Sequence, residues 1–184
     1  ADVLETLVAL NTVLSERGGT EHRAAAAARV IRMRSGNWCS QRSALVDTIG
    51  AKDGAPMHPD QLMLRLADAM PDDAVIVDEG LTSTRVLPQL FPYRDARSYY
   101  GLASGGIGFA VAGAVGIRLA IPDRPVVAVI GDGSAMYNIQ ALWTAAHLGL
   151  RLVYVIANNG GYRILKQRVR AGHGVERFIG MDFT

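Results

Sequence analysis

The spacing of hydrophobic residues changes near residue 56 of the chain. Before that point, apolar residues at positions 3, 4, 7, 8, 10 and 14 recur at helical intervals and predict a short helix that Gly18 ends. A second helix is predicted over roughly residues 21–34, but it consists mostly of Ala and Arg and offers few large apolar groups for burial. We therefore expect residues 1–55 to form a connector that packs on something else.

From Pro56 onward, the pattern alternates between helices and strands. A helix opens at residues 58–60, and its Leu62, Leu66 and Ala69 share one face. Fully apolar runs of strand length follow at residues 74–77, 126–130 and 152–157. Another helix is predicted near residues 139–148. Apolar strands separated by helices predict an α/β fold in which a parallel sheet carries helices on both faces.

Composition and charge narrow the class of protein. The 184 residues are 49% hydrophobic and 20% charged, which suits one folded domain with an appendage and excludes disorder for the bulk of the chain. The 19 Lys and Arg against 17 Asp and Glu give a net charge of +2 without any basic block, so we expect no nucleic-acid partner. The longest weakly polar stretch, residues 105–117, is shorter than the roughly 20 residues of a membrane span, so we expect no membrane segment.

The cysteine count and the N-terminus bear on location. A single cysteine, Cys39, excludes an internal disulfide, and we expect it to be a small buried residue in a reducing compartment. The first residues carry neither a start Met nor the basic and apolar regions of a secretory signal. We therefore expect a cytoplasmic protein of which this chain is one piece.

Polar clusters follow two of the predicted strands. Gly131-Asp132-Gly133 comes directly after the run at 126–130, and Asn158-Asn159 directly after the run at 152–157. In a parallel βαβ unit both clusters fall at the same edge of the sheet, where open α/β sheets bind ligands. Carboxylate and amide oxygens suit Mg²⁺ or Ca²⁺ better than zinc. Either cluster alone is an ordinary turn, but their conjunction at this spacing is far more specific.

These motifs give the chain a family resemblance. The Gly-Asp-Gly cluster, the closing Asn-Asn and the glycine-rich residues 101–110 upstream resemble the thiamine diphosphate-dependent 2-oxoacid decarboxylase and acetolactate synthase superfamily. Within it, Gly-Asp-Gly-Ser-Ala and Ala-Leu-Trp-Thr-Ala-Ala look most like benzoylformate decarboxylases. The resemblance covers about residues 56–166 and implies the thiamine diphosphate-binding fold.

The resemblance also implies a cofactor and a metal, with residues for each. The side chains of Asp132 and Asn159 and the backbone carbonyl of Gly161 would be ligands of Mg²⁺. The residues implied for thiamine diphosphate are Thr82, Gly105, Ile107, Gly133 and Ser134.

Each implied cofactor residue has a distinct role. Thr82 and Ser134 would contact the diphosphate, and Gly133 would let the backbone approach it closely. The Gly105 carbonyl would accept from the 4′-amino group, and Ile107 would support the bent cofactor. Leu81 departs from the family pattern, because relatives carry a hydroxyl there; Thr82, Ser83 or Thr84 are the alternatives.

The resemblance implies an activity and partners as well. Residues 1–55 would be the end of a middle domain plus a linker, and residues 56–184 a thiamine diphosphate-binding domain that is incomplete at its C-terminus. The expected protein decarboxylates or ligates small 2-oxo acids as a homodimer or homotetramer. The catalytic glutamate would lie on the pyrimidine-binding domain of a second subunit, so we expect no catalytic residue in this chain. The alternative is a non-catalytic, regulatory α/β module that binds a nucleotide or phosphate.

Several residues carry weaker expectations. Glu79 is interpreted as the cap of a turn, and His147 as a packing or surface residue. His173 is expected in a loop or lid. The basic run from Arg163 to Arg170 is typical of a solvated helix face, with steering of an anionic substrate as the alternative.

Overall fold

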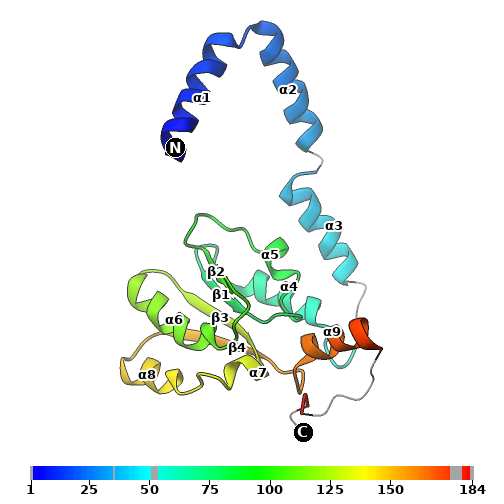
Figure 1. The fold of residues 1–184 in the computed structure, drawn as a ribbon, viewed down its shortest axis with the longest axis vertical. Helices are drawn as coiled ribbons and strands as arrows, with labels where there is room; N and C mark the ends of the chain where they lie inside the picture. Colours follow the sequence, from blue (N-terminus) through cyan, green and yellow to red (C-terminus); the bar gives the residue numbers. More distant parts are fainter. Residues whose placement is uncertain (1, 35, 51–53, 175–179, 183–184) are drawn as a thin grey trace. The chain divides into compact units, whose positions relative to one another are not determined.

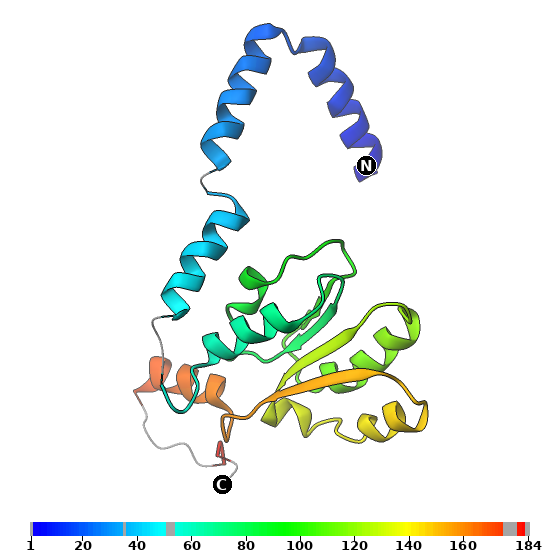
Figure 2. The same ribbon diagram turned by 180° about the vertical axis from the view of Figure 1, so that it is seen from behind.

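The chain divides into two compact units, Ala1–Leu45 and Val46–Thr184. The computed structural model describes residues 2–34, 36–50, 54–174 and 180–182. Both units are drawn from opposite sides in Figures 1 and 2.

The first unit consists of helices. Helix α1 (Val3–Arg17) and helix α2 (Thr20–Arg34) confirm the two expected helices. Helix α3 (Trp38–Gly50), which begins in the first unit and ends in the second, was not predicted. Asp2 caps α1, because its side chain accepts a hydrogen bond from the Leu4 amide at 2.8 Å. Neither α1 nor α2 buries a residue. Cys39 is exposed, so the expectation of a buried cysteine was wrong; α3 places it on a surface that this chain does not cover.

The second unit is built on a four-stranded parallel sheet. Its strands are β1 (Val75–Glu79), β2 (Tyr99–Gly101), β3 (Val126–Gly131) and β4 (Leu152–Ala157). They lie in the order β2-β1-β3-β4, and every pair is parallel. The three apolar runs predicted to be strands are confirmed. The short β2 was not, because its Tyr-Tyr-Gly sequence carries no apolar run.

Helices cover both faces of this sheet, as predicted. Figures 1 and 2 show α4 (Pro59–Ala69) and α5 (Leu87–Leu90) on one side, and α6 (Phe109–Ala120) and α8 (Ala141–His147) on the other. The fully buried side of α4 is the one that carries Met63 and Ala67 rather than the predicted face of Leu62 and Leu66. Both faces are apolar in the sequence, and packing within the folded unit selects one of them.

Helix α6 was not among the predicted elements, since its sequence is rich in glycine, a poor helix former. The small side chains of Ala110 and Ala114 are fully buried and pack with Val77 and Ala128 of the sheet. Small residues on this helix therefore permit a close approach to the strands. Among the described residues, no helix has the length and apolar character needed to cross a membrane.

Two short helices complete the second unit near the carboxyl ends of the strands. Helix α7 (Asp132–Ala135) follows β3, and helix α9 (Arg163–His173) follows β4. His173 is the last residue of α9, so its expected place in a loop was wrong: the helix continues to a left-handed Gly174. No residue of α9 is buried, which fits the expectation of a solvated basic face.

Candidate functional site

Asp132 and the loop after β4 lie side by side at the carboxyl edge of the sheet. Strands β3 and β4 are neighbours, with Gly131 paired to Ala157 at their ends, so the next residue of each strand enters the same loop cluster. The Asp132 carboxylate accepts a hydrogen bond from the Gly160 amide at 2.8 Å. The predicted adjacency of the two polar clusters is therefore confirmed.

A small cavity of about 30 Å³ collects most of the predicted site residues. Those that line it are Thr82, Asp132, Gly133, Ser134, Asn159 and Gly161. They come from the turn after β1, from α7 and from the loop after β4. The structure thus brings together six of the eight residues proposed for the metal and the cofactor.

The turn after β1 offers few hydroxyl groups to this cavity. Thr82 lines it, but Ser83 and Thr84 are 6% and 3% exposed and are not among its lining residues. Gly80 is required next to Thr84, because a Cβ at Gly80 would lie 2.1 Å from the Thr84 methyl group. Leu81 lines the cavity with an apolar side chain and has a φ of 51°, a conformation that disfavours residues other than glycine. Of the alternatives for the missing hydroxyl, only Thr82 is suitably placed.

Gly105 and Ile107 lie apart from the small cavity, in the segment between β2 and α6. Gly105 is exposed with a φ of 74°, which glycine adopts without strain, and Ile107 is half-buried. The described residues therefore do not wholly cover this segment.

Glu79 fixes the end of that segment, a role that its interpretation as a turn cap missed. Its carboxylate is 1% exposed and accepts hydrogen bonds from the amides of Gly108 and Ala110, both at 2.5 Å. A carboxylate is favourable here because it meets the positive end of α6. The Asn138 side chain donates to the Gly108 carbonyl at 2.6 Å. The last residue of β1 therefore anchors the glycine-rich segment to the sheet edge.

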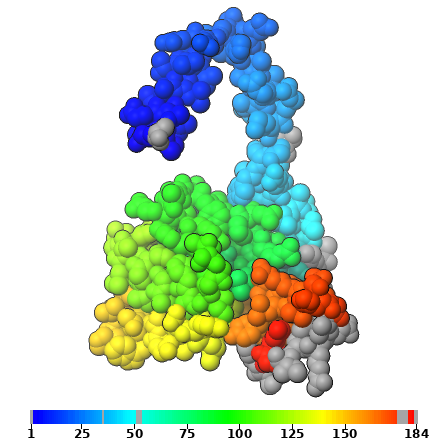
Figure 3. Space-filling model, in the orientation of Figure 1, coloured from blue at the N-terminus to red at the C-terminus, as the bar shows by residue number. Residues whose placement is uncertain are grey.

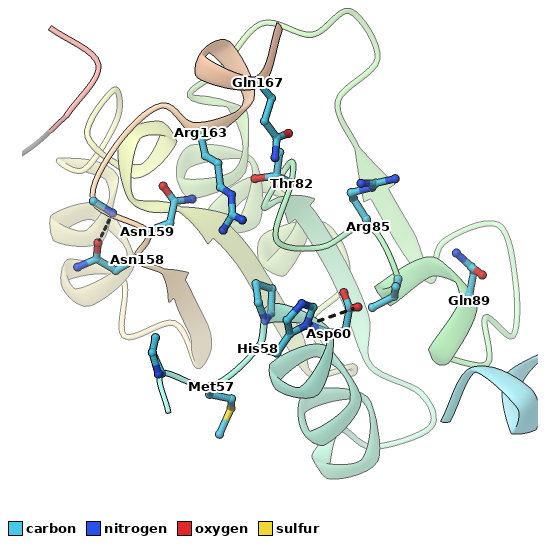
Figure 4. A pocket seen from close by; sticks show the side chains of 14 residues that line it. Met57, His58, Asp60, Thr82, Arg85, Gln89, Asn158, Asn159, Arg163 and Gln167 are labelled. Carbon is cyan, nitrogen blue, oxygen red and sulfur yellow. Dashed lines mark hydrogen bonds and ion pairs between the residues drawn. The ribbon is translucent and has the colours of Figure 1, made fainter. Parts of the chain in front are cut away.

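A larger cavity of about 880 Å³ adjoins the small one. Figure 4 shows its walls, which are residues 56–60, the turn after β1 with α5, and the start of α9 with the loop before it. Thr82, Asn159 and Arg163 line both cavities. Sequence reasoning placed Arg163 on a solvated face; that it also borders both cavities depends on the direction of α9, which the sequence does not reveal.

Tyr162 lies close to Asp132 and forms a hydrogen bond with Tyr137. The hydrogen bond between Tyr162 and Tyr137 is the main cause that raises the pKa of Tyr162, and burial and the negative charge of Asp132 act in the same direction. Tyr162 therefore stays a neutral hydrogen-bonding group at neutral pH.

The donor atoms at this edge suit a hard cation. One oxygen of Asp132 accepts from Gly160, and the other has no hydrogen-bond partner among the residues that the structure describes. Asn159 and Gly161 line the same cavity, and the Gly161 carbonyl accepts a hydrogen bond from the Arg163 amide at 2.9 Å. Within the described ranges, no group of three or more His, Cys, Asp or Glu residues is close enough to hold a metal. The donor set therefore fits Mg²⁺ shared with a phosphate-bearing ligand.

Comparison with known proteins identifies the family. Residues 81–183 match the family model described as "Thiamine pyrophosphate enzyme, C-terminal TPP binding domain". This match covers more than half of the chain, so the chain belongs to the thiamine pyrophosphate (thiamine diphosphate) enzymes through their C-terminal cofactor-binding domain.

Individual relatives agree with this assignment. Over 116 residues the chain is 39% identical to the benzoylformate decarboxylase of Pseudomonas aeruginosa, covering 63% of this chain and 22% of that protein. It is 35% identical over 121 residues to the acetolactate synthase large subunit of Parasynechococcus marenigrum, covering 65% and 19%. The chain thus spans about a fifth of these relatives.

Solved structures show the same fold. The thiamine diphosphate-dependent 4-hydroxybenzoylformate decarboxylase of Rhodococcus jostii matches with a TM-score of 0.67 and 39% identity, covering 72% of this chain and 25% of that one. The benzoylformate decarboxylase of Polynucleobacter necessarius matches with a TM-score of 0.66 and 29% identity, covering 70% and 25%. The predicted fold class is therefore confirmed.

Proposed function

We propose that the protein is a thiamine diphosphate- and Mg²⁺-dependent decarboxylase or carboligase of small 2-oxo acids. The observation that carries this proposal is the gathering of six expected cofactor and metal residues around one cavity, with Asp132 fixed by the Gly160 amide. Family membership and the aryl 2-oxo acid decarboxylases among the relatives support it. When bound, the cofactor would supply the carbanion that attacks the ketone and would take up the electron pair that stays behind when CO₂ leaves.

In this proposal, the residues of the chain bind and orient the cofactor. Asp132, Asn159 and Gly161 hold Mg²⁺, which neutralises the diphosphate, while Thr82, Gly133 and Ser134 contact its oxygens. Gly105 and Ile107 position the pyrimidine and thiazolium rings, and Glu79 keeps their segment in place through Gly108. The segment between β2 and α6 can then contact the cofactor rings without a change in its conformation.

We also propose that a pyrimidine-binding domain of a second subunit completes the site in a homodimer or homotetramer. Support comes from apolar side chains left exposed in the second unit: Met136, Tyr137, Trp143, Val153 and Ile156 are between 43% and 69% exposed. Figure 3 shows the yellow segment that includes α8 forming part of the surface. Large apolar side chains exposed in this number are typical of surfaces that another chain covers. A cytoplasmic location is part of the same proposal, since a lone cysteine needs no oxidising compartment.

A decarboxylation assay tests the proposed activity. The full-length protein, loaded with thiamine diphosphate and Mg²⁺, is expected to release CO₂ from benzoylformate or pyruvate, and the release should stop when the cofactor is removed by dialysis against a chelator. A panel of aryl and alkyl 2-oxo acids separates the two substrate classes. Absence of cofactor-dependent turnover and of ligated product with every 2-oxo acid would contradict the proposed activity.

A further inference from the structure

The large cavity extends well beyond the small cavity at the sheet edge. Its volume of about 880 Å³ lies in the roughly 300–1,000 Å³ range of small-molecule sites. Residues 56–60 and the exposed side chains of Arg85 and Gln89 line it but do not line the small cavity. The part of the cavity next to Arg163 therefore borders the residues proposed for the metal. The remainder of the cavity lies outside the proposed metal and cofactor site.

The cavity carries two cationic groups that have no partner in the described chain. Arg85 comes from the turn after β1 and Arg163 from the first position of α9, so they belong to different walls (Figure 4). Neither guanidinium makes an ion pair or a hydrogen bond with any residue whose placement the structure describes. Elsewhere in this unit, Arg124 is engaged with Asp95 at 3.0 Å. Arg85 and Arg163 are therefore available to an external anion.

The other charged group of the cavity does not neutralise them. Asp60 is its single carboxylate among the lining residues, and its oxygen lies 3.5 Å from Nδ1 of His58. That Nδ1 also accepts a hydrogen bond from the Asp60 amide at 3.2 Å. Two arginines against one aspartate leave the cavity with a positive charge.

An anion at the border between the two cavities would find few neutral donors in the turn after β1. Leu81 offers no side-chain donor, and Ser83 and Thr84 are buried away from both cavities. Thr82 alone supplies a hydroxyl. Charge-assisted hydrogen bonds from a guanidinium are about twice as strong as neutral ones and match the geometry of phosphate oxygens. The two arginines therefore supply hydrogen-bond donors for an anion that the hydroxyl groups of the turn after β1 do not supply.

We propose that Arg85 and Arg163 bind a phosphate group in the large cavity, next to the edge that it shares with the small one. The phosphate is either the terminal phosphate of thiamine diphosphate, in which case the site rests on the proposed function, or the phosphate of a second ligand. A phosphate carries enough charge and enough acceptor oxygens to engage cations on two walls, which a single carboxylate does less well.

Calorimetric titrations of the full-length protein with Mg²⁺ present distinguish these sources. The probes are thiamine diphosphate, thiamine monophosphate and inorganic phosphate, the last added to protein already saturated with Mg²⁺ and thiamine diphosphate. The test variant is the double substitution Arg85→Gln and Arg163→Gln. The matched control is Arg151→Gln. Arg151 is also an exposed arginine, but it lies just before the first residue of β4, whereas the cavity lies beyond the last residue of that strand. Thermal melts verify that both variants fold.

If the anion is the terminal phosphate, the double variant should bind thiamine diphosphate at least tenfold more weakly than the parent, because loss of one charged hydrogen bond is equivalent to about a tenfold change or more in affinity. Its affinity for thiamine monophosphate should be unchanged. If a second ligand supplies it, the double variant should keep its cofactor affinity and lose the binding of inorganic phosphate. Either result supports the site. The proposal is overturned if the double variant binds all three probes as the parent and Arg151→Gln do, or if the parent binds none of them. If the parent does not bind thiamine diphosphate, inorganic phosphate is titrated with Mg²⁺ alone. Phosphate binding that depends on the arginines would then retain this site and reject the proposed function.

Discussion

Replacement of Asp132 by Ala is expected to weaken Mg²⁺-dependent binding of thiamine diphosphate by at least about a hundredfold. Loss of groups that merely orient a metal ligand costs roughly 10- to 100-fold in metal affinity, so loss of the ligand itself should cost no less. Asp132 is the one carboxylate among the residues that line the small cavity. Without it, the proposed metal site would keep only neutral protein ligands.

The same substitution should leave the fold largely intact. Asp132 lies after the end of β3 and is only half-buried, so its truncation opens no cavity in the core. The loss of its hydrogen bond to Gly160 accounts for about 1 kcal/mol of unfolding free energy. Thermal melts of the cofactor-free parent and variant should therefore be similar, while calorimetric titration separates them.

Asp132→Asn provides the control for charge. The amide keeps the size of the side chain and an acceptor for the Gly160 amide, but it removes the negative charge that attracts Mg²⁺. We expect it to resemble the parent in stability and Asp132→Ala in cofactor binding. Unchanged cofactor affinity in both variants would show that Asp132 is not a metal ligand.

Replacement of Glu79 by Ala is expected to lower the unfolding free energy by about 2–6 kcal/mol. The carboxylate accepts from two amides, Gly108 and Ala110, and each buried donor left without a partner costs roughly 1–3 kcal/mol. Glu79 itself is 1% exposed, so water does not readily replace it. The midpoint and slope of chemical denaturation measure the effect.

Two variants make the Glu79 result specific. Glu79→Gln retains an acceptor for one amide but sets its NH₂ group against the other, so an intermediate loss is expected. Glu16→Ala removes an exposed carboxylate from α1 and should change stability by less than about 0.5 kcal/mol. A loss below about 1 kcal/mol for Glu79→Ala would mean that the two hydrogen bonds do not hold the start of α6.

The sequence predicted those parts of the site that depend on strand ends. Asp132 and Asn159 follow apolar runs whose strand character is evident, and parallel pairing then places both at one sheet edge. Strand assignment and parallel pairing were sufficient to predict that these two residues lie near each other.

The contributions that sequence reasoning missed depend on contacts between distant segments. Glu79 lies 29 residues before Gly108, and neither residue signals the other in the sequence. Arg163 was recognised as part of a basic helix face, but its place beside both cavities requires the direction in which α9 leaves the loop. The burial of Met63 instead of Leu62 likewise results from packing, because both are equally apolar.

The most direct test of the central claim is a titration of thiamine diphosphate into the metal-free full-length protein with and without added Mg²⁺. A metal site built from Asp132, Asn159 and Gly161 predicts saturable binding that requires Mg²⁺, is reversed by a chelator and is lost in Asp132→Ala. Binding of equal strength without the metal, or no binding with it, would contradict the assignment of this sheet edge as the cofactor site.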